Sequence, residues 1–185
     1  MNAKRKLWPV LALVVAGCGY NTIQTYDEQV NAAFSQINVQ LQRRADLIPN
    51  LVSTVQAYAK QERDIFTAVA DARSRLSGAI QSNDPQQMAD ANQALNAPLG
   101  RLLAIVENYP QLKSNENFRA LQDELAGTEN RIAVSRQDYN DAVNRYNAYI
   151  RRFPQVLTAK VTGAKARTYF QATAAADTAP QVKFN

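Results

Sequence analysis

The sequence predicts an all-α protein, an antiparallel up-and-down four-helix bundle with long helices and a short C-terminal extension. Apolar residues recur at spacings of three and four over most of the chain, which is the period of helices that bury one face. Only 6 Gly and 7 Pro among 185 residues leave room for long uninterrupted elements. The composition, 46% hydrophobic and 20% charged, is that of a globular chain that can bury a core.

Residues 1–17 are predicted to be a cleaved signal peptide. Lys4, Arg5 and Lys6 form a basic start, and the apolar stretch 7–17 follows directly. This stretch is too short to span a bilayer, which needs about 20 residues, so a secretory signal is the better interpretation. Removing the three basic residues lowers the formal net charge from +5 to +2, which is too little to indicate a nucleic-acid partner.

The only cysteine, Cys18, follows Val15, Ala16 and Gly17, and these four residues resemble the bacterial lipobox. The resemblance implies that the thiol receives a diacylglycerol and becomes the first mature residue, with residues 18–22 as a short tether. Each buried methylene of the lipid contributes about 0.8 kcal/mol, so two or three acyl chains anchor the protein stably. The alternative is a free or buried core thiol. Gly19, in place of Asp, favours the outer membrane of a two-membrane host. We therefore expect a lipoprotein that faces the periplasm or the cell exterior.

The helical bundle is expected over residues 23–154. Helical apolar spacing covers 23–41 and resumes over 51–76, and Pro49 lies between the two runs. Proline ends or kinks a helix outside the first turn, and Asp46 is a suitable N-cap. We therefore expect a turn near 44–49 between two antiparallel helices. The alternative is one kinked helix over 20–77, which would be roughly 85 Å long.

A third helix is predicted from the start signal Asn83-Asp84-Pro85 to about Asn108, where Pro110 stops it. Pro98 and Gly100 predict a break or kink near Ala97.

The last helix carries apolar residues seven apart, which predicts a face packed along a partner helix for about 50 Å. These residues are Phe118, Leu125, Ile132, Tyr139, Tyr146 and Phe153. Ser114 or Asn115 is expected to cap its start, and Pro154 to end it. Residues 155–185 are predicted to contain a short helix, Gln155–Thr162, ended by Gly163, and then a loosely ordered tail. In that tail, Tyr169-Phe170 and Val182/Phe184 are placed to pack back onto the bundle.

Most enzyme classes are excluded by what the sequence lacks. Without histidine there is no Ser-His-Asp triad, no Cys-His pair and no imidazole-bound metal, and no Gly-rich phosphate loop is present. Asp123, Glu124 and Glu129 lie on one helix, but adjacent residues point about 100° apart and do not converge on a metal. We expect Glu129 to pair with Arg131 and Arg136. We predict no catalytic residue, metal, cofactor or small-molecule substrate; a carboxylate hydrolase is the weakest alternative.

Several segments resemble the LemA family, and the resemblance extends from Tyr20 to the end of the chain. These segments are 38–52, 109–113, 115–118, 127–134, Tyr139-Asn140, Tyr146-Asn147, 151–154 and 179–184. The resemblance implies a four-helix bundle attached to a membrane at its N-terminus, by a transmembrane helix in many members and by lipid here. It implies no activity. Pro98 departs from the family's unbroken third helix, which puts the straightness of that helix in doubt.

Two functions follow as expectations. The first is a non-enzymatic envelope scaffold or adaptor that docks a partner protein at the bundle end formed by 43–50 and 107–113. Its contact residues would be Arg43, Arg44, Leu47 and Ile48. The second is a module that binds lipid or a cell-envelope polymer through a basic C-terminal segment, for which a solvated tail is the alternative. Its residues would be Arg151, Arg152, Lys160, Lys165 and Arg167.

Overall fold

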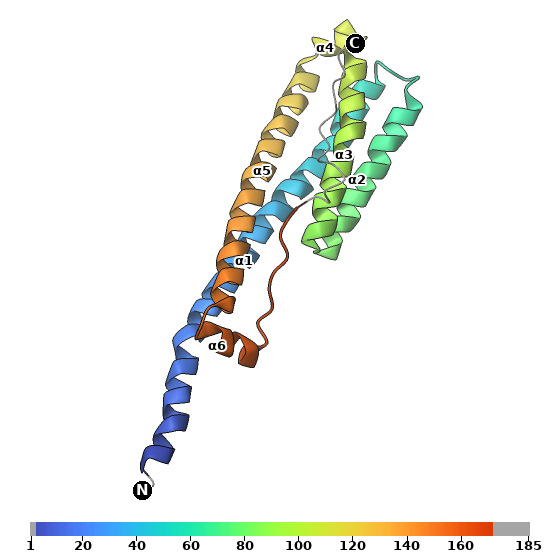
Figure 1. Ribbon diagram of the computed structural model, residues 1–185. Coiled ribbons are helices and arrows are strands. Elements are labelled where there is room, and N and C mark those ends of the chain that lie inside the picture. The colour runs from blue at the N-terminus through green and yellow to red at the C-terminus, as the bar shows by residue number, and fades with distance from the viewer. Residues whose placement is uncertain (1–2, 172–185) are drawn as a thin grey trace, which may run out of the picture. The chain divides into compact units, whose positions relative to one another are not determined.

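The computed structural model describes the backbone of residues 3–171 and the side chains of residues 19–171, and every regular element in this part of the chain is a helix (Figure 1). The all-α prediction is therefore confirmed. The helices are α1 (Ala3–Gln56), α2 (Arg63–Ser82), α3 (Pro85–Val106), α4 (Pro110–Lys113), α5 (Glu116–Arg151) and α6 (Gln155–Thr162). Cys18 and the lipobox residues Val15, Ala16 and Gly17 lie in α1, but their side chains are outside the described residues, as are Val182 and Phe184.

The chain divides into two compact units, to each of which α1 and α5 contribute a segment. Within the described residues, unit 1 comprises 3–37 and 133–169, and unit 2 comprises 38–132 and 170–171. Among the described helices, none combines the length and the apolar character that crossing a bilayer requires.

The predicted turn near 44–49 is wrong, because α1 continues through Pro49 to Gln56 and the chain reverses at 57–62. The alternative of one helix over 20–77 is wrong as well, since that reversal lies inside it. Asp46 is not a cap: its Oδ1 accepts a hydrogen bond of 2.8 Å from Nε2 of Gln42, one turn earlier in the same helix.

Helix α1 tolerates Pro49 because a second helix replaces the hydrogen bond that proline removes. Pro49 has no N–H, so the Ala45 carbonyl loses its partner within the helix. Nε of Arg73, on α2, donates to that carbonyl oxygen at 2.8 Å. The apolar face of α1 also continues through the proline without a change of phase. Its buried residues here are Leu41, Ala45, Ile48, Leu51 and Val55.

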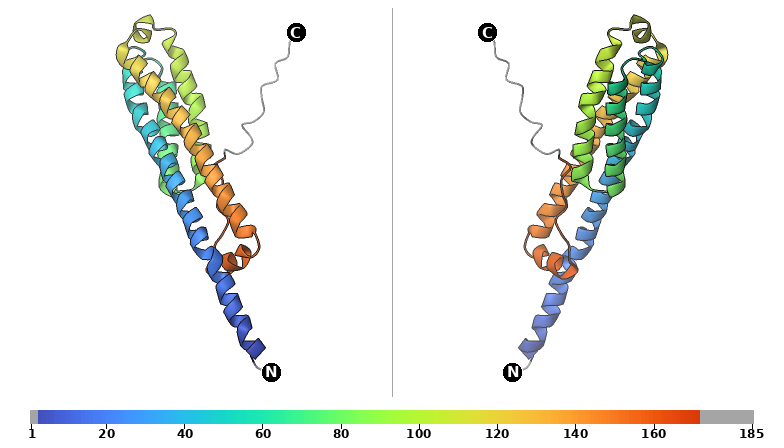
Figure 2. Two further views of the ribbon diagram at one scale, coloured as in Figure 1. Left: turned by 90° about the vertical axis from the view of Figure 1, so that its left-hand side faces the viewer. Right: turned by 90° about the vertical axis from the view of Figure 1, so that its right-hand side faces the viewer.

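Helices α2 and α3 form an antiparallel hairpin in unit 2 and lie side by side in both views of Figure 2. Asn83 ends α2 in the left-handed conformation, with φ of 52°. Asp84 then caps α3, accepting from the N–H groups of Gln86 (2.8 Å) and Gln87 (3.3 Å), and these bonds lower the pKa of Asp84. The predicted start of the third helix is confirmed. The predicted break near Ala97 is wrong, since α3 runs uninterrupted to Val106.

The ends of α5 and α6 follow the predicted signals. Oδ1 of Asn115 accepts from the N–H of Phe118 at 3.0 Å, which makes Asn115 the cap of α5. Helix α6 spans Gln155–Thr162 as predicted, and Gly163 ends it with φ of 74°. Most of the predicted heptad residues of α5 are buried, but Phe153 lies beyond the end of the helix and is 80% exposed. Its assignment to the core is wrong.

In unit 1, the segment after α6 returns along α5 (Figure 1), and side chains of α5 hold it there through hydrogen bonds to its backbone. Oη of Tyr139 donates to the Thr168 carbonyl at 2.7 Å. The Asn147 amide bonds both the N–H and the carbonyl of Arg167, at 2.8 and 2.9 Å. Rings of α1 and α5 also meet, Tyr26 with Tyr149 edge to face and Phe34 with Tyr139. Phe170, the next residue along the chain, belongs to unit 2 and is buried.

Removing the Arg73 donor tests how α1 accommodates Pro49. Arg73→Met keeps the apolar stem, and we expect it to lower the free energy of unfolding by about 1–3 kcal/mol because a carbonyl loses its partner. Pro49→Ala restores an N–H that can bond this carbonyl. Arg73→Met should therefore lower the free energy of unfolding clearly less when it is combined with Pro49→Ala than when it is made alone. Urea unfolding of the four proteins, followed by circular dichroism, measures the difference. Arg75→Met, at an exposed arginine of α2, is the matched control. Equal costs in both backgrounds would contradict the assignment.

Alkaline unfolding tests the contact between α5 and the returning segment. Burial raises the pKa of Tyr139 to about 12, although the charge of Arg167 opposes this. A tyrosine in the unfolded chain ionises near about pH 10. The unfolded state therefore loses its proton first, and stability should fall by about 2–3 kcal/mol between pH 10 and 12.

Tyr139→Phe should cost about 1 kcal/mol at neutral pH through the lost hydrogen bond and should flatten this alkaline decline. Thermal melts of both proteins across that pH range supply the comparison. An unchanged alkaline slope in Tyr139→Phe would rule out Tyr139 as its cause.

Candidate functional site: an arginine-centred polar seam and the adjoining groove

The predicted docking residues all lie in the middle of α1 rather than in a turn, and they do not share one surface. Arg44 and Ile48 are four residues apart and belong to the buried face of α1, so neither is exposed as a residue that docks a partner would have to be. Arg43 is exposed and Leu47 half-buried. The turn that meets the start of α5 is 57–62, where Nδ2 of Asn115 donates to Oη of Tyr58 at 3.3 Å.

Arg44 is the centre of a polar seam that links α1, α3 and α5 within unit 2. Its side chain is 7% exposed, and Nη1 bonds Oδ1 of Asn92 and lies 2.8 Å from Oε2 of Glu129. Nη2 donates to Oδ1 of Asn96 at 2.8 Å. Burial lowers the pKa of Arg44, and the Glu129 carboxylate acts in the opposite direction. The Nε atom is buried without a hydrogen-bond partner among the described residues.

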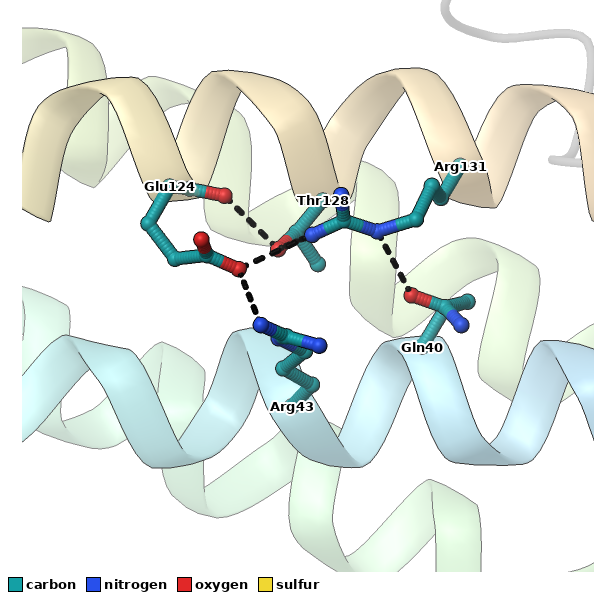
Figure 3. Close-up of polar contacts among 5 residues, drawn as sticks. All are labelled: Gln40, Arg43, Glu124, Thr128 and Arg131. Carbon is teal, nitrogen blue, oxygen red and sulfur yellow. Dashed lines mark hydrogen bonds and ion pairs between the residues drawn. The ribbon is translucent and has the colours of Figure 1, made fainter.

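The neighbouring Arg43 occupies a different environment on the α1–α5 surface (Figure 3). Its side chain is 54% exposed, and Nη2 lies 2.7 Å from Oε1 of Glu124. Arg131 reaches the same oxygen with Nη2 at 2.9 Å and donates from Nε to Gln40 at 3.2 Å. One carboxylate on α5 therefore joins an arginine of α1 to an arginine of its own helix.

Thr128 of α5 also takes part in this network. Oγ1 of Thr128 donates to the Glu124 carbonyl at 2.7 Å and accepts from Nη2 of Arg131 at 3.1 Å. A Cβ on Gly127 would lie 3.4 Å from Nη1 of Arg131, which is ordinary van der Waals contact.

The pairing predicted for Glu129 with Arg131 and Arg136 is wrong: Glu129 pairs with Arg44, and Arg131 with Glu124. Both glutamates are bound as counter-ions of arginines, so the seam cross-links helices and presents no free acid and base pair. Among the described residues, no group of three or more His, Cys, Asp and Glu side chains is gathered as a metal site.

A groove of about 680 Å³ lies between α1 and α2, and Arg43 is part of its lining. It is lined by Asn38, Val39, Gln42, Arg43, Asp46, Leu47 and Asn50 of α1 and by Ile80 of α2. Val39 is 57% exposed, and Oδ1 of Asn38 is buried without a hydrogen-bond partner in the described structure. A smaller, mostly apolar cavity of about 290 Å³ adjoins Arg44 and Glu129 on the α3–α5 side.

The predicted basic residues of the C-terminal segment belong to unit 1 and are not equivalent. Arg151, Arg152, Lys160 and Lys165 are exposed. Arg167 instead donates from Nε and Nη2 to the two carboxylate oxygens of Asp27, at 2.9 and 2.8 Å, so its charge is already neutralised. The sequence analysis did not predict the exposed apolar side chains of Leu157 and Val161 in the same segment.

Sequence reasoning also missed Asn92, Asn96 and Arg73, which satisfy Arg44 and the Ala45 carbonyl. The sequence did contain a signal for Asn92 and Asn96. Asn92 and Asn96 are four residues apart on α3, and Asn92 occupies the same helical face as the apolar residues Ala89 and Leu99. A polar residue within an apolar face indicates a buried polar partner, here an arginine from another helix.

Comparisons with known proteins agree on one family. The LemA family model matches residues 33–184, a range that includes the whole seam and groove. Magnetosome protein MamQ 2 and magnetosome protein MamQ 1 of Paramagnetospirillum magneticum are each 34% identical over 182 aligned positions. Magnetosome protein MamQ of Magnetospirillum gryphiswaldense is 31% identical. Each alignment covers 86% of this chain and 67% of the relative.

The two adjacent arginines should differ sharply in their effect on stability. Arg44→Ala leaves Asn92 without its donor and opens a cavity, and we expect it to lower the free energy of unfolding by about 3–5 kcal/mol. Arg43→Ala breaks an exposed ion pair and should cost less than about 1 kcal/mol. Urea unfolding of the two variants and the parent protein provides the comparison. Similar losses in both variants would contradict the central position of Arg44.

Proposed function

Because this chain belongs to the LemA family, we propose that it is a membrane-anchored, non-enzymatic scaffold that holds a helix of a partner protein in the groove between α1 and α2. The observation that supports this proposal is the groove itself. Val39 is exposed in its wall, and the buried side-chain oxygen of Asn38 lacks a hydrogen-bond partner among the described residues. The proposal includes the lipid on Cys18, a periplasmic or external location with the outer membrane favoured, and an up-and-down four-helix bundle as the arrangement of the whole chain.

The shape of the groove favours a helix as its occupant. Its lining runs along α1 from Asn38 to Asn50, which is roughly 18 Å, or more than three turns. Val39 and Leu47 are spaced at about two turns, and Ile80 faces them from α2. Such spacing matches the apolar stripe of an amphipathic helix laid in a groove.

The chemistry of the rim adds specificity to this apolar contact. Asn38, Gln42 and Asn50 supply amides, while Arg43 and Asp46 supply one charge of each sign. A donor on the partner helix would satisfy the unpartnered Asn38 oxygen, which is costly to leave buried without a bond. Arg43 also reaches Glu124 on α5, so the rim of the groove is tied to the seam that fixes α1.

A non-catalytic role is supported by the use of the carboxylates. Glu124 and Glu129 are held by arginines, and the chain contains no histidine. The relatives are called magnetosome proteins, a name for a cellular structure rather than for a reaction, which also supports a structural role.

Site-specific photo-crosslinking in cells tests the groove. With a photoreactive amino acid at Val39, we expect a discrete adduct whose partner peptide carries apolar residues three and four apart. Val134 on α5 is the matched control, since it is a valine of similar exposure, 61% against 57%, outside the groove. Leu47→Glu should abolish the Val39 adduct, because it places a charge in the apolar wall. Mass spectrometry of the adduct identifies the crosslinked peptide.

Absence of an adduct at Val39, or identical adducts at Val39 and Val134, would overturn the docking assignment. Circular dichroism of Leu47→Glu shows whether the variant still folds, and Gln42→Glu provides a second change within the groove at an exposed position. Replacing Cys18 by Ala tests the anchor separately, through the loss of the protein from the membrane fraction.

A further inference from the structure

A second unpartnered surface lies in unit 1, around helix α6. Phe153, Leu157 and Val161 are 80%, 51% and 85% exposed, and each is four residues from the next. Leu157 and Val161 therefore project from the same face of α6, with Phe153 just before its start. Of the seven large apolar side chains exposed among the described residues, three fall within these nine positions. Single exposed apolar residues are ordinary, but a cluster of this kind marks a contact surface.

Basic side chains surround the apolar cluster. Arg151 and Arg152 precede it, Lys160 lies within α6 and Lys165 follows, and all four are exposed. No acidic residue occurs between Asp141 and Asp177 in the sequence. Asp27 of α1 is the carboxylate that faces this segment, and Arg167 neutralises it. In the described part of unit 1, none of these four basic side chains forms an ion pair with an acidic residue, so their positive charge is not paired locally.

The position of α6 relates this surface to the N-terminal end of the described side chains. Gly19 is buried against the start of α6, where a Cβ would lie 3.1 Å from Cγ of Gln155 and 3.7 Å from Oη of Tyr149. Tyr20, the next residue, is 45% exposed. Gly19 directly follows Cys18, the proposed site of lipid attachment, so an anchor there brings α6 to the bilayer surface.

We propose that the α6 face, consisting of Phe153, Leu157, Val161 and the flanking Arg151, Arg152, Lys160 and Lys165, lies on an anionic phospholipid bilayer. The apolar side chains enter the boundary between headgroups and acyl chains, and the basic groups remain at the level of the phosphates. Charge complementarity selects a bilayer over a protein partner as the occupant, because four exposed basic groups that form no ion pair match a surface of uniform negative charge.

The α6 face goes beyond the scaffold function and does not depend on the groove of unit 2. The unlipidated chain should bind anionic vesicles through this face, but a helix of only two turns adds little further affinity once a lipid anchor is present. Its consequence is orientation: an anchor alone allows rotation, whereas a second contact beside it fixes which side of unit 1 faces the bilayer.

A fluorescent probe on α6 tests the proposal. The full chain has a single cysteine, so Cys18→Ala with Val161→Cys gives one labelling position for an environment-sensitive dye. Vesicles of phosphatidylcholine with phosphatidylglycerol should shift the dye emission to the blue and protect it from acrylamide quenching. Vesicles of phosphatidylcholine alone should do so only weakly. The same dye at Val134→Cys on α5 is the control and should remain accessible to quencher.

Charge reversal provides a second measurement. Lys160→Glu with Lys165→Glu should weaken the dye response to anionic vesicles by at least about tenfold in lipid concentration, because each basic group contributes to attraction at such a surface. Both positions are exposed, so folding should be retained, and circular dichroism checks this.

Three results would overturn the proposal. In the first, the dye at position 161 stays as accessible as that at 134 while the chain cosediments with anionic vesicles. In the second, the responses to the two vesicle compositions are equal, and in the third, the chain does not bind anionic vesicles at all. The purified chain contains no partner protein, so a failure here leaves the groove of unit 2 untouched, and a failure of the Val39 crosslink leaves the α6 face untouched.

Discussion

The Arg44 guanidinium constrains the packing of α1, α3 and α5, because a buried cation needs a counter-ion and hydrogen-bond acceptors wherever it sits. Glu129 supplies the charge, and two asparagines one turn apart on α3 supply the acceptors. Any shift of one helix along another would separate these groups, so the seam fixes the register of three helices at one level of unit 2. The apolar core around it would tolerate such a shift more easily, since apolar contact is not directional.

A second constraint acts five residues further along α1, at Pro49, and decides the length of that helix. Pro49 removes a backbone donor, and Arg73 on α2 supplies a partner to the Ala45 carbonyl that is left without one. The helix therefore remains continuous where its own local chemistry favours an end. This continuity has a functional consequence, because the residues from Asn38 to Asn50 form one wall of the groove only if α1 is unbroken there. The proline is thus compatible with the groove because of an arginine on another helix.

The two proposed contact surfaces use the same physical principle with different partners. The groove of unit 2 combines apolar side chains with amides and charges of both signs, which suits the varied surface of a protein helix. The α6 face of unit 1 combines apolar side chains with positive charge alone, which suits the uniform charge of an anionic bilayer. In both units, arginine–carboxylate pairs connect the segment that carries the surface to a neighbouring helix, through Glu124 in one and Asp27 in the other.

The sequence by itself determined the helical class and those boundaries that depend on local chemistry. Asp84 with Pro85, Asn115, and Gly163 act through bonds to residues two to five positions away, so their roles could be predicted without a fold. The ambiguous signals were those settled by a distant partner. From the sequence alone, Pro49 predicts a helix end, and only the structure shows that Arg73 bonds the carbonyl left without a partner. Likewise Arg43 and Arg44 look equivalent in the sequence, whereas the tertiary structure buries Arg44 against α3 and leaves Arg43 at the surface. Cap and turn chemistry is local and visible in sequence, whereas the satisfaction of a buried carbonyl or cation is a property of packing between helices.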